Sequence, residues 1–295
     1  MGLNTKKILG ISVTTSSKKT ILEYIEKYLG KSSVVSRQSS EKPKKLLVIV
    51  TPNTEQIVYA QTDRHFVKLL NEADIAIPDG IGISLAAKFL GSRGQGIKES
   101  RIVQRIPGVE LMEDLVKIAA KEAYSIGLIG GRTGVAVKAL ECLQAKHPGL
   151  DGWVDELGEV QIANLGDLRP VVEKIRSTRT RFVFVGLGAP KQEYFIEELV
   201  RYSLLVHRKT GNVHNDQPTN KLTNHSLVLM SVGGSFDILS GTIVRAPQAI
   251  QAIGLEWLWR LIREPWRFRR QFALLKFLWL IIREKLASQG IALRS

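Results

Sequence analysis

The sequence has little cysteine and no long apolar run. Cys142 is the single cysteine in 295 residues, which excludes an internal disulfide and a cysteine metal cluster and fits a reducing compartment. The N-terminus has no apolar stretch long enough for a signal peptide. No window reaches the roughly 20 apolar residues of a spanning helix. The nearest, residues 272–282, is interrupted by Lys276. We therefore expect a cytosolic protein whose contact with a membrane, at the inner face of the plasma membrane, is peripheral.

Motifs for metals and for nucleotides are also missing. No D-x-D pair ends a strand, and three of the five histidines lie in or beside one polar stretch, so we predict no metal site. The turn GLGAPK lacks the third glycine of G-x-G-x-x-G, and no P-loop motif occurs. These gaps argue against a dinucleotide-dependent oxidoreductase, and we predict no cofactor.

Acidic residues are too few to balance the basic ones. With 42 Lys and Arg against 28 Asp and Glu, the net charge is +14, which indicates a polyanionic partner such as nucleic acid, anionic lipid or a phosphorylated substrate. From Arg245 to the C-terminus, ten basic residues stand against three Glu, so seven of the fourteen excess charges lie there, among apolar residues. A nucleic-acid-binding protein would need basic residues spread over a groove-sized face with aromatics to stack on bases. It remains the alternative from another class.

The C-terminal segment combines arginine with tryptophan. It carries four of the five Trp, and Arg260, Arg263 and Arg267 share one stripe at helical spacing, with Arg270 one turn further on. Guanidinium groups bind phosphate in bidentate fashion, and Trp with a basic rim suits a headgroup zone. We expect residues 241–295 to be a helical, basic, amphipathic appendage that associates with a membrane. The alternative is a basic amphipathic helix packed on its own domain.

Strand-like apolar runs alternate with helical patterns before this appendage. Each main run is followed by a glycine-bearing turn or by polar residues. We predict strands at 46–53, 125–134, 181–190 and 227–234, and shorter ones at 7–13 and 75–78. We predict helices at 55–71, 108–122, 134–146, 168–177 and 191–202. This alternation is typical of an α/β, Rossmann-like fold whose mostly parallel sheet carries helices on both faces, with a catalytic domain over 1–240. Two polar stretches, 31–45 and 207–226, are expected to be mobile insertions.

Polar residues that follow strands are the candidate site, because ligands of open α/β sheets bind outside the carboxyl ends of the strands. Thr51 and Asn53 follow the first strong strand, although an N-cap would explain them equally. Asp79 and Gly80 follow an apolar strand, where burial would raise the pKa of the carboxyl and suit a general base. Asp-Gly is also an ordinary turn pair.

Two glycine turns, GGRTG and GLGAPKQE, could approach a phosphate at a helix N-terminus. The second opens its helix with Lys191, Gln192 and Glu193, a denser polar set than a turn requires.

Taken in order, these segments closely resemble the WecG/TagA/CpsF family of bacterial glycosyltransferases from about residue 7 to 271. The matching segments are TPNTEQIVYA, ADIAIPDGIGISLAAKFLG, RIPGVELMEDL, GLIGGRTGVAVKALECLQAKHPGL, FVFVGLGAPKQE and SVGGSFDILSGTIVRAPQAIQAIGLEWLWRLIREPWRFRRQ. The resemblance implies a metal-independent, inverting transfer of an N-acetylmannosamine-type sugar from a UDP donor. The acceptor implied is a polyprenyl-diphosphate-linked sugar in the cytoplasmic leaflet, and the product implied is a precursor of a cell-surface polymer. The resemblance also suggests a homodimer.

The resemblance also implies roles for residues of this sequence. Asp79 corresponds to the base, Thr51 to its neighbouring threonine, and the arginines over the diphosphate to Arg260, Arg267 and Arg270. Lys191 is expected to pair with phosphate. The substrate-binding candidates are Asn53, Gly80, Gly130, Gly131, Gly186, Gly188, Lys191, Gln192, Glu193, Asp237 and Arg245. The sequence departs from the family pattern at 151–160, where DGWVDELGEV replaces the usual aromatic-containing loop.

Overall fold

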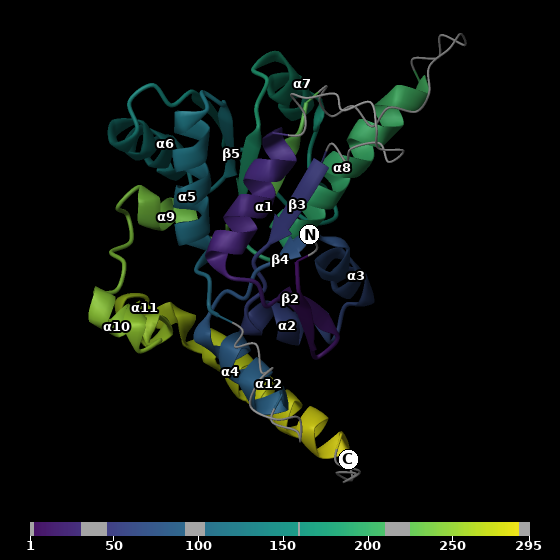
Figure 1. Cartoon of the computed structure of the whole chain (residues 1–295), viewed down its shortest axis with the longest axis vertical. Helices are drawn as coiled ribbons and strands as arrows, with labels where there is room; N and C mark the ends of the chain where they lie inside the picture. The colour runs from purple at the N-terminus through teal and green to yellow at the C-terminus, as the bar shows by residue number, and fades with distance from the viewer. Residues whose placement is uncertain (1–2, 31–45, 92–103, 159, 210–224, 289–295) are drawn as a thin grey trace.

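The computed structural model describes residues 3–30, 46–91, 104–158, 160–209 and 225–288 (Figure 1). One sheet of six strands has the order β4-β3-β8-β7-β5-β6, and every neighbouring pair is parallel. The strands are β3 (Leu46–Val50), β4 (Ile75–Ala76), β5 (Ile126–Gly130), β6 (Gly152–Asp155), β7 (Phe182–Gly186) and β8 (Leu227–Ser231). The predicted Rossmann-like α/β fold is confirmed.

Helices cover both faces of the sheet, which is why its central strands are apolar throughout. β5 and β8 are buried at every position, as expected for strands covered on both sides. One face packs on α1 (Lys18–Gly30), α5 (Gly108–Lys121), α6 (Val135–Lys146) and α9 (Ser235–Leu239). The other packs on α7 (Arg169–Ser177) and α8 (Lys191–Lys209).

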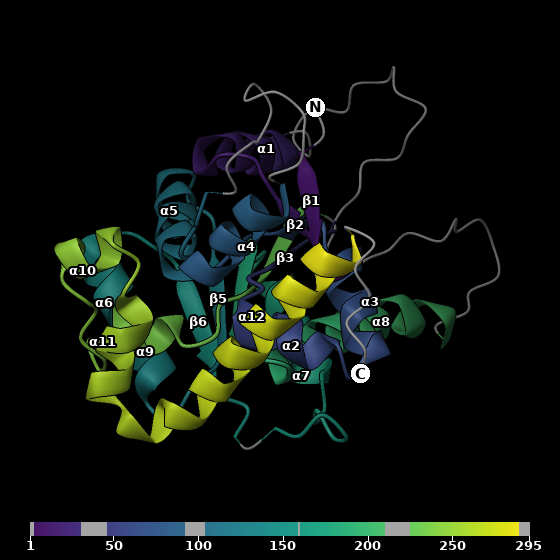
Figure 2. The ribbon, with the colours of Figure 1, turned by 90° about the horizontal axis from the view of Figure 1, so that it is seen from below.

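A second apolar cluster lies at the lower end of the molecule in Figure 1. It joins the hairpin of β1 (Thr5–Ile8) and β2 (Ile11–Thr14) to α2 (Thr54–Ala60), α3 (Arg64–Glu72), α4 (Ile81–Gly91) and α12 (Arg269–Ala287). Seen from below, α12 runs across the underside of the protein beside α2 and α4 (Figure 2).

The C-terminal segment reaches this cluster through short helices. They are α10 (Gln248–Ala252), α11 (Glu256–Arg263) and the 3-10 helix η1 (Pro265–Phe268). Phe277 and Ile281 of α12 are buried beside Ile57 and Phe66. The last long helix therefore completes the core of the body, and the division at residue 240 stays a prediction about domains.

Two elements differ from their predicted form. The single strand predicted at 7–13 is wrong, because Leu9 and Gly10 have positive φ values of 48° and 83° and turn the chain into the β1–β2 hairpin. The single helix predicted at 55–71 is also wrong. The Asp63 carboxylate accepts the N–H of Phe66 at 3.0 Å and caps a new helix, α3.

Other boundaries were missed or lie outside the described residues. The elements α1, α4 and β6 were not predicted, and α8 continues seven residues past the predicted end at 202. The predicted insertion at 31–45 lies outside the described residues, as does 210–224 of the second one.

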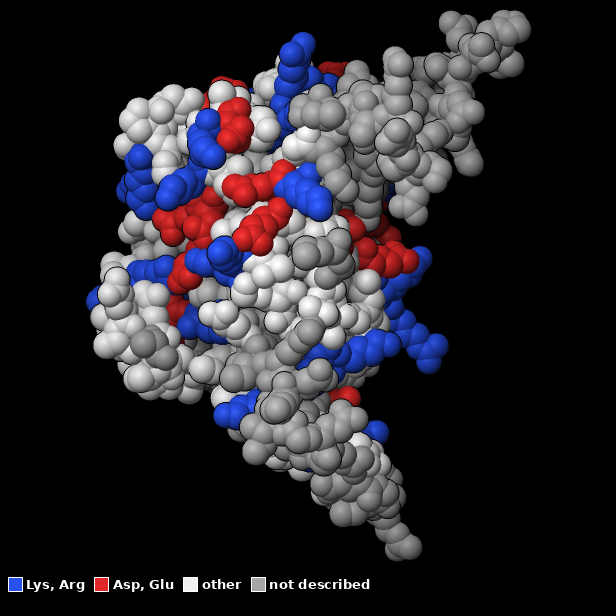
Figure 3. Space-filling model, viewed as in Figure 1, with Lys and Arg blue, Asp and Glu red and all other residues white. Residues whose placement is uncertain are grey.

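Charged side chains of both signs lie on the described surface. On the face seen in Figure 3, acidic and basic side chains are interleaved over α1 and α5 rather than gathered into one basic patch. Among the described residues, no helix has both the length and the apolar character that a membrane span requires.

Candidate active site

A cleft of about 1350 Å³ lies at the carboxyl ends of β3, β4, β5, β7 and β8. The C-terminal segment closes its other side with α11 and α12. Twelve predicted site residues line the cleft: Thr51, Asn53, Asp79, Gly80, Gly131, Gly186, Gly188, Lys191, Gln192, Asp237, Arg245 and Arg260. Gly130 and Glu193 lie behind its wall. Arg267 belongs to η1 and Arg270 to the first turn of α12, but their side chains lie outside the described part of the structure.

Asp79 is held in place by backbone hydrogen bonds. Its N–H donates to the carbonyl of Pro52 at 3.0 Å, and the N–H of Gly108, the first residue of α5, donates to its carboxylate. A Cβ on Gly108 would come within 3.3 Å of Thr51 Cγ2. A glycine at position 108 therefore lets a helix N-terminus approach the carboxylate closely.

The pKa of the Asp79 carboxyl is raised above its ordinary value, because burial penalises the charged form. Arg105, Arg260 and Arg245 act in the opposite direction, in that order of size, and so does the Gly108 N–H. A half-buried carboxylate with a raised pKa has the properties of a general base.

Thr51 lines the cleft, but its hydroxyl is used inside the protein. The side chain is 5% exposed, and Oγ1 donates to the carbonyl of Ser231 at 3.3 Å. This bond ties the end of β3 to the end of β8. Thr51 therefore fixes the loop after β3, which brings Asn53 into the same cleft as Asp79.

Asn53 is the N-cap of α2. Its Oδ1 accepts the N–H of Gln56 at 3.0 Å, and Gln56 Oε1 accepts the N–H of Asn53 at 3.0 Å. This reciprocal capping box is the structural alternative that the sequence left open. Asn53 also lines the cleft, so it is both the N-cap of α2 and a residue of the site.

Gln192, which lines the cleft, and Glu193, which lies behind its wall, form a buried hydrogen-bonded framework. Gln192 Oε1 accepts the N–H of Gly233 at 2.9 Å, and Gln192 Nε2 donates to Glu193 Oε1 at 2.8 Å. Gln56 Nε2 donates to the same oxygen at 3.1 Å. Burial raises the pKa of the Glu193 carboxyl to about 7. These contacts lock together the loops after β3, β7 and β8.

The glycines of the two turns let those loops touch. A Cβ at Gly130 would lie 2.5 Å from Leu187 Cδ2, and one at Gly186 would lie 2.6 Å from Phe236 Cε2. The N–H of Gly131 donates to the carbonyl of Gly186 at 3.0 Å, so this amide is already used. Both turns still face the cleft, with Lys191 at the start of α8.

Arg260 points from α11 toward the turn after β8. Its Nη2 lies 3.5 Å from the position a Cβ would take on Gly234. This nitrogen is buried and has no hydrogen-bond partner in the described part of the chain. Nε lies 3.9 Å from Oε2 of Glu264. Because a buried N–H without a partner is costly, Arg260 is arranged to receive an acceptor atom from outside.

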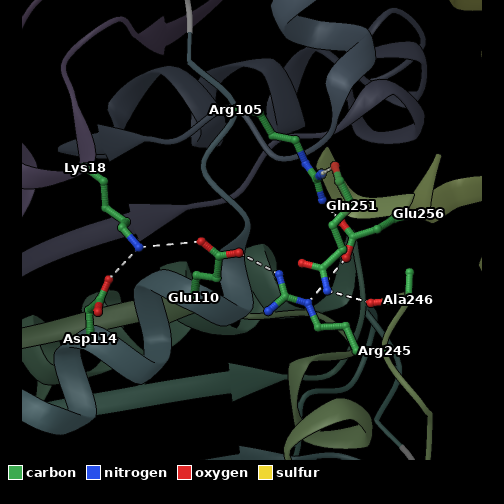
Figure 4. A network of polar contacts seen from close by, with 8 residues as sticks. All are labelled: Lys18, Arg105, Glu110, Asp114, Arg245, Ala246, Gln251 and Glu256. Atoms are coloured by element: carbon green, nitrogen blue, oxygen red, sulfur yellow. Dashed lines mark hydrogen bonds and ion pairs between the residues drawn. The ribbon is translucent and has the colours of Figure 1, made fainter. Parts of the chain in front are cut away.

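Ion pairs connect α11 to the body (Figure 4). Glu256 of α11 lies between two arginines: it pairs with Arg105, and its Oε1 accepts from Arg245 Nε at 3.3 Å. Arg245 Nη2 reaches Glu110 Oε1 at 2.6 Å, and Lys18 lies 3.5 Å from the other oxygen of Glu110. The segment before α5, α5 itself and the C-terminal segment are therefore joined around the cleft.

Arg105 is a site residue that the sequence reasoning missed. It lines the cleft, and it is the largest of the cationic influences on Asp79. Its sequence signal was the single cation two residues before the Pro107–Gly108 start of α5. That signal has no periodicity, so only the fold reveals it.

Asp237, at the start of α9, pairs with Arg132 at 2.5 Å, and both residues line the cleft.

Among the described residues, no three His, Cys, Asp or Glu side chains gather as a metal site.

The fold and the cleft define the class of protein: an α/β protein with a cleft, lined in part by arginines, outside the carboxyl ends of a parallel sheet, where ligands of such folds bind. The model of the glycosyl transferase WecG/TagA/CpsF family matches residues 6–206 and 216–290. The chain therefore belongs to this family, as its sequence resemblance predicted. It is a glycosyltransferase, as predicted.

Its relatives include three enzymes of Staphylococcus aureus, from strains MW2, NCTC 8325 / PS 47 and MRSA252. Each is named N-acetylglucosaminyldiphosphoundecaprenol N-acetyl-beta-D-mannosaminyltransferase. Each is 27% identical to this chain over 289 residues, which cover 96% of the chain and 94% of the relative.

Proposed function

We propose that the protein transfers N-acetylmannosamine from UDP to N-acetylglucosamine carried on a polyprenyl diphosphate, with inversion and without a metal ion. The names of its relatives support the sugar and the acceptor. The observation that carries the proposal is Asp79, half-buried in the cleft with Arg105, Arg245 and Arg260 close enough to influence its pKa. One carboxylate among three cations suits the removal of a proton beside a diphosphate.

Asp79 acts as the base in this proposal. The acceptor hydroxyl oxygen bonds to the anomeric carbon while its proton passes to the Asp79 carboxylate. The bond from the anomeric carbon to the diphosphate oxygen breaks, and its electron pair leaves with UDP. Attack from the face opposite UDP inverts the configuration. A base so placed contributes on the order of 10²–10⁴-fold.

Arginine takes the part of a metal ion. Charge grows on the UDP diphosphate as it leaves, and preorganised cations stabilise it. Arg260 offers a buried N–H without a partner among the described residues, and the backbone brings Arg267 and Arg270 to the η1–α12 junction next in the chain. The glycine turns after β5 and β7, with Lys191, line the part of the cleft proposed for the UDP group.

The C-terminal segment places the enzyme on the membrane. Large apolar side chains are exposed along α11, η1 and α12, among them Trp257, Ile262, Phe268, Phe272, Leu275 and Trp279. Cations flank them, with Arg263 over the Trp259 ring at 5.1 Å and Arg283 over Trp279 at 5.4 Å. Such a surface binds in the headgroup zone of a bilayer, here that of the cytoplasmic leaflet where the acceptor lies.

A transfer assay tests the proposal. A panel of UDP-sugars is offered with a polyprenyl-diphosphate GlcNAc analogue, with and without EDTA, and products are analysed by mass spectrometry and NMR. We expect a ManNAc-GlcNAc product with inverted anomeric configuration, formed equally in EDTA. Transfer of a different sugar would refute the donor, retention would refute the inversion, and loss in EDTA would refute the role given to arginine.

A further inference from the structure

The cleft has two halves of opposite character. Arg105, Arg245 and Arg260 surround Asp79 in one half. In the other, α4 and α12 supply walls that are almost entirely apolar. The two helices lie side by side on the underside of the protein (Figure 2).

Four exposed apolar side chains face this second half. Leu85 and Phe89 stand one turn apart on α4 and are 58% and 47% exposed. Leu278 and Ile282 stand one turn apart on α12 and are each 49% exposed. Phe277 and Ile281 lie below them, buried, as the floor. Spacing of i, i+4 places each pair along one helix face, so the four form two apolar walls.

This apolar groove begins at the catalytic carboxylate. α4 starts at Ile81, directly after Asp79 and Gly80. From Ile81 to Phe89 the helix rises about 12 Å. At the far end Lys285 Nζ donates to the carbonyl of Phe89 at 2.8 Å and lies 5.2 Å from the centre of its ring. The groove is therefore short and is bridged where α4 ends.

A ligand that fills both halves has an anionic head and a hydrocarbon tail. The arginines fit a diphosphate and the groove fits a chain a few isoprene units long. We propose that the α4–α12 groove binds the first isoprene units of the acceptor's polyprenyl chain. The inference rests on the proposed function, because that function supplies the polyprenyl diphosphate.

A different face of α12 serves the membrane. Phe272, Leu275 and Trp279 are exposed by 65%, 63% and 53%, but they do not line the cleft. Leu275 and Leu278 are therefore a matched pair: the same residue type on one helix, with one outside the groove and one inside it.

The test measures binding, without donor and without vesicles. GlcNAc-diphosphate esters with zero, one, two or three isoprene units are titrated into the full-length protein below their micelle concentrations, with calorimetric detection. We expect the Kd to fall at least about threefold for each added unit, because each buries apolar surface. The ratio of the Kd without isoprene to that with three should fall about tenfold in Leu278→Ser and in Leu85→Ser, and should stay at the wild-type value in Leu275→Ser.

A Kd independent of chain length overturns the inference, and so does an equal effect of Leu275→Ser and Leu278→Ser. In the second case the tail binds the outer face of α12 instead. Unchanged binding of the ester without isoprene shows that a variant is folded. Because no turnover is needed, a protein that binds the tails in this pattern yet forms no ManNAc product would refute only the proposed function.

Discussion

The two sides of the cleft are built by different physical means. The loops after β3, β7 and β8 are locked by neutral hydrogen bonds among buried groups, such as Thr51 to Ser231 and Gln192 to Gly233. The C-terminal side is held by ion pairs at Glu256 and by two apolar side chains, Phe277 and Ile281. Asp79 follows the sheet, whereas Arg260 arrives on α11, so the two can face one cleft only when the C-terminal segment is docked on the body.

The largest expected effect is on the sheet side. Asp79→Asn keeps the shape but cannot accept a proton, so we expect turnover to fall about 10²–10⁴-fold with UDP-sugar binding unchanged. Steady-state kinetics and calorimetry measure the two quantities. Asp114→Asn, on α5 and away from the cleft, is the matched control. Substantial turnover of Asp79→Asn would rule Asp79 out as the base.

Removing a buried side chain of α12 should lower the stability of the protein. Phe277 is 1% exposed, so Phe277→Ala should lower the free energy of unfolding by about 3–5 kcal/mol. Phe272→Ala, on the same helix but 65% exposed, should change it by no more than about 0.5 kcal/mol. Urea denaturation measures both. Equal effects would mean that α12 is not part of the core.

Glu193 should make the free energy of unfolding depend on pH. Its folded pKa of about 7 lies above the ordinary 4.5, so the folded protein holds the proton longer and stability falls as pH rises between these values. Glu193→Gln should remove up to about 3 kcal/mol of the difference in unfolding free energy between pH 5 and pH 8. Glu198→Gln, a partly buried residue on the same helix that pairs with Arg201, should leave that difference near the wild-type value. An unchanged difference in Glu193→Gln would contradict the assignment.

Arg260 tests the charge supplied by the docked helix. Arg260→Ala should lower kcat about 100-fold, because one donor to the leaving diphosphate is lost. Arg263→Ala, on the same helix but stacked on Trp259 outside the cleft, should leave kcat near wild type. If both variants lose the same activity, the effect belongs to the helix and not to the guanidinium.

The smallest effect, on the free energy of unfolding, is expected at the ion pairs that connect α11 to the body. Glu256→Gln leaves Arg105 and Arg245 without their shared counter-ion, so thermal unfolding should show a loss of about 1–2 kcal/mol, reduced by partial exposure. Glu113→Gln removes a more exposed pair with Lys146 and should cost less than about 1 kcal/mol. An equal loss in both would show that Glu256 has no special part in docking.

The sequence predicted the residues at the strand ends better than the contacts between the body and the C-terminal segment. Apolar strands followed by glycine located Asp79 and the two turns, because strand ends of a parallel sheet meet at one edge. It predicted Gln192 and Glu193 as substrate contacts, and this stays a prediction: Gln192 lines the cleft, and both side chains also form hydrogen bonds inside the protein. Polar residues before a helix look alike whether they face a ligand or a neighbouring loop, and only packing separates the two.

The ion pair between Arg105 and Glu256 could not be predicted from the sequence for a related reason. They are about 150 positions apart in the chain, and neither belongs to a repeating pattern. Their pairing depends on how α11 returns to the body. The amphipathic pattern of α12 was visible, but not that Phe277 and Ile281 face the core while Leu275 and Trp279 face outward.

The residue proposed to accept the proton stands three positions after β4, a strand of two residues that pairs only with β3 within the described sheet. Central strands exchange their amide hydrogens only when the whole domain opens, whereas a short edge strand separates locally at much lower free energy. The amides of β4 should therefore exchange with solvent before those of β7 and β8.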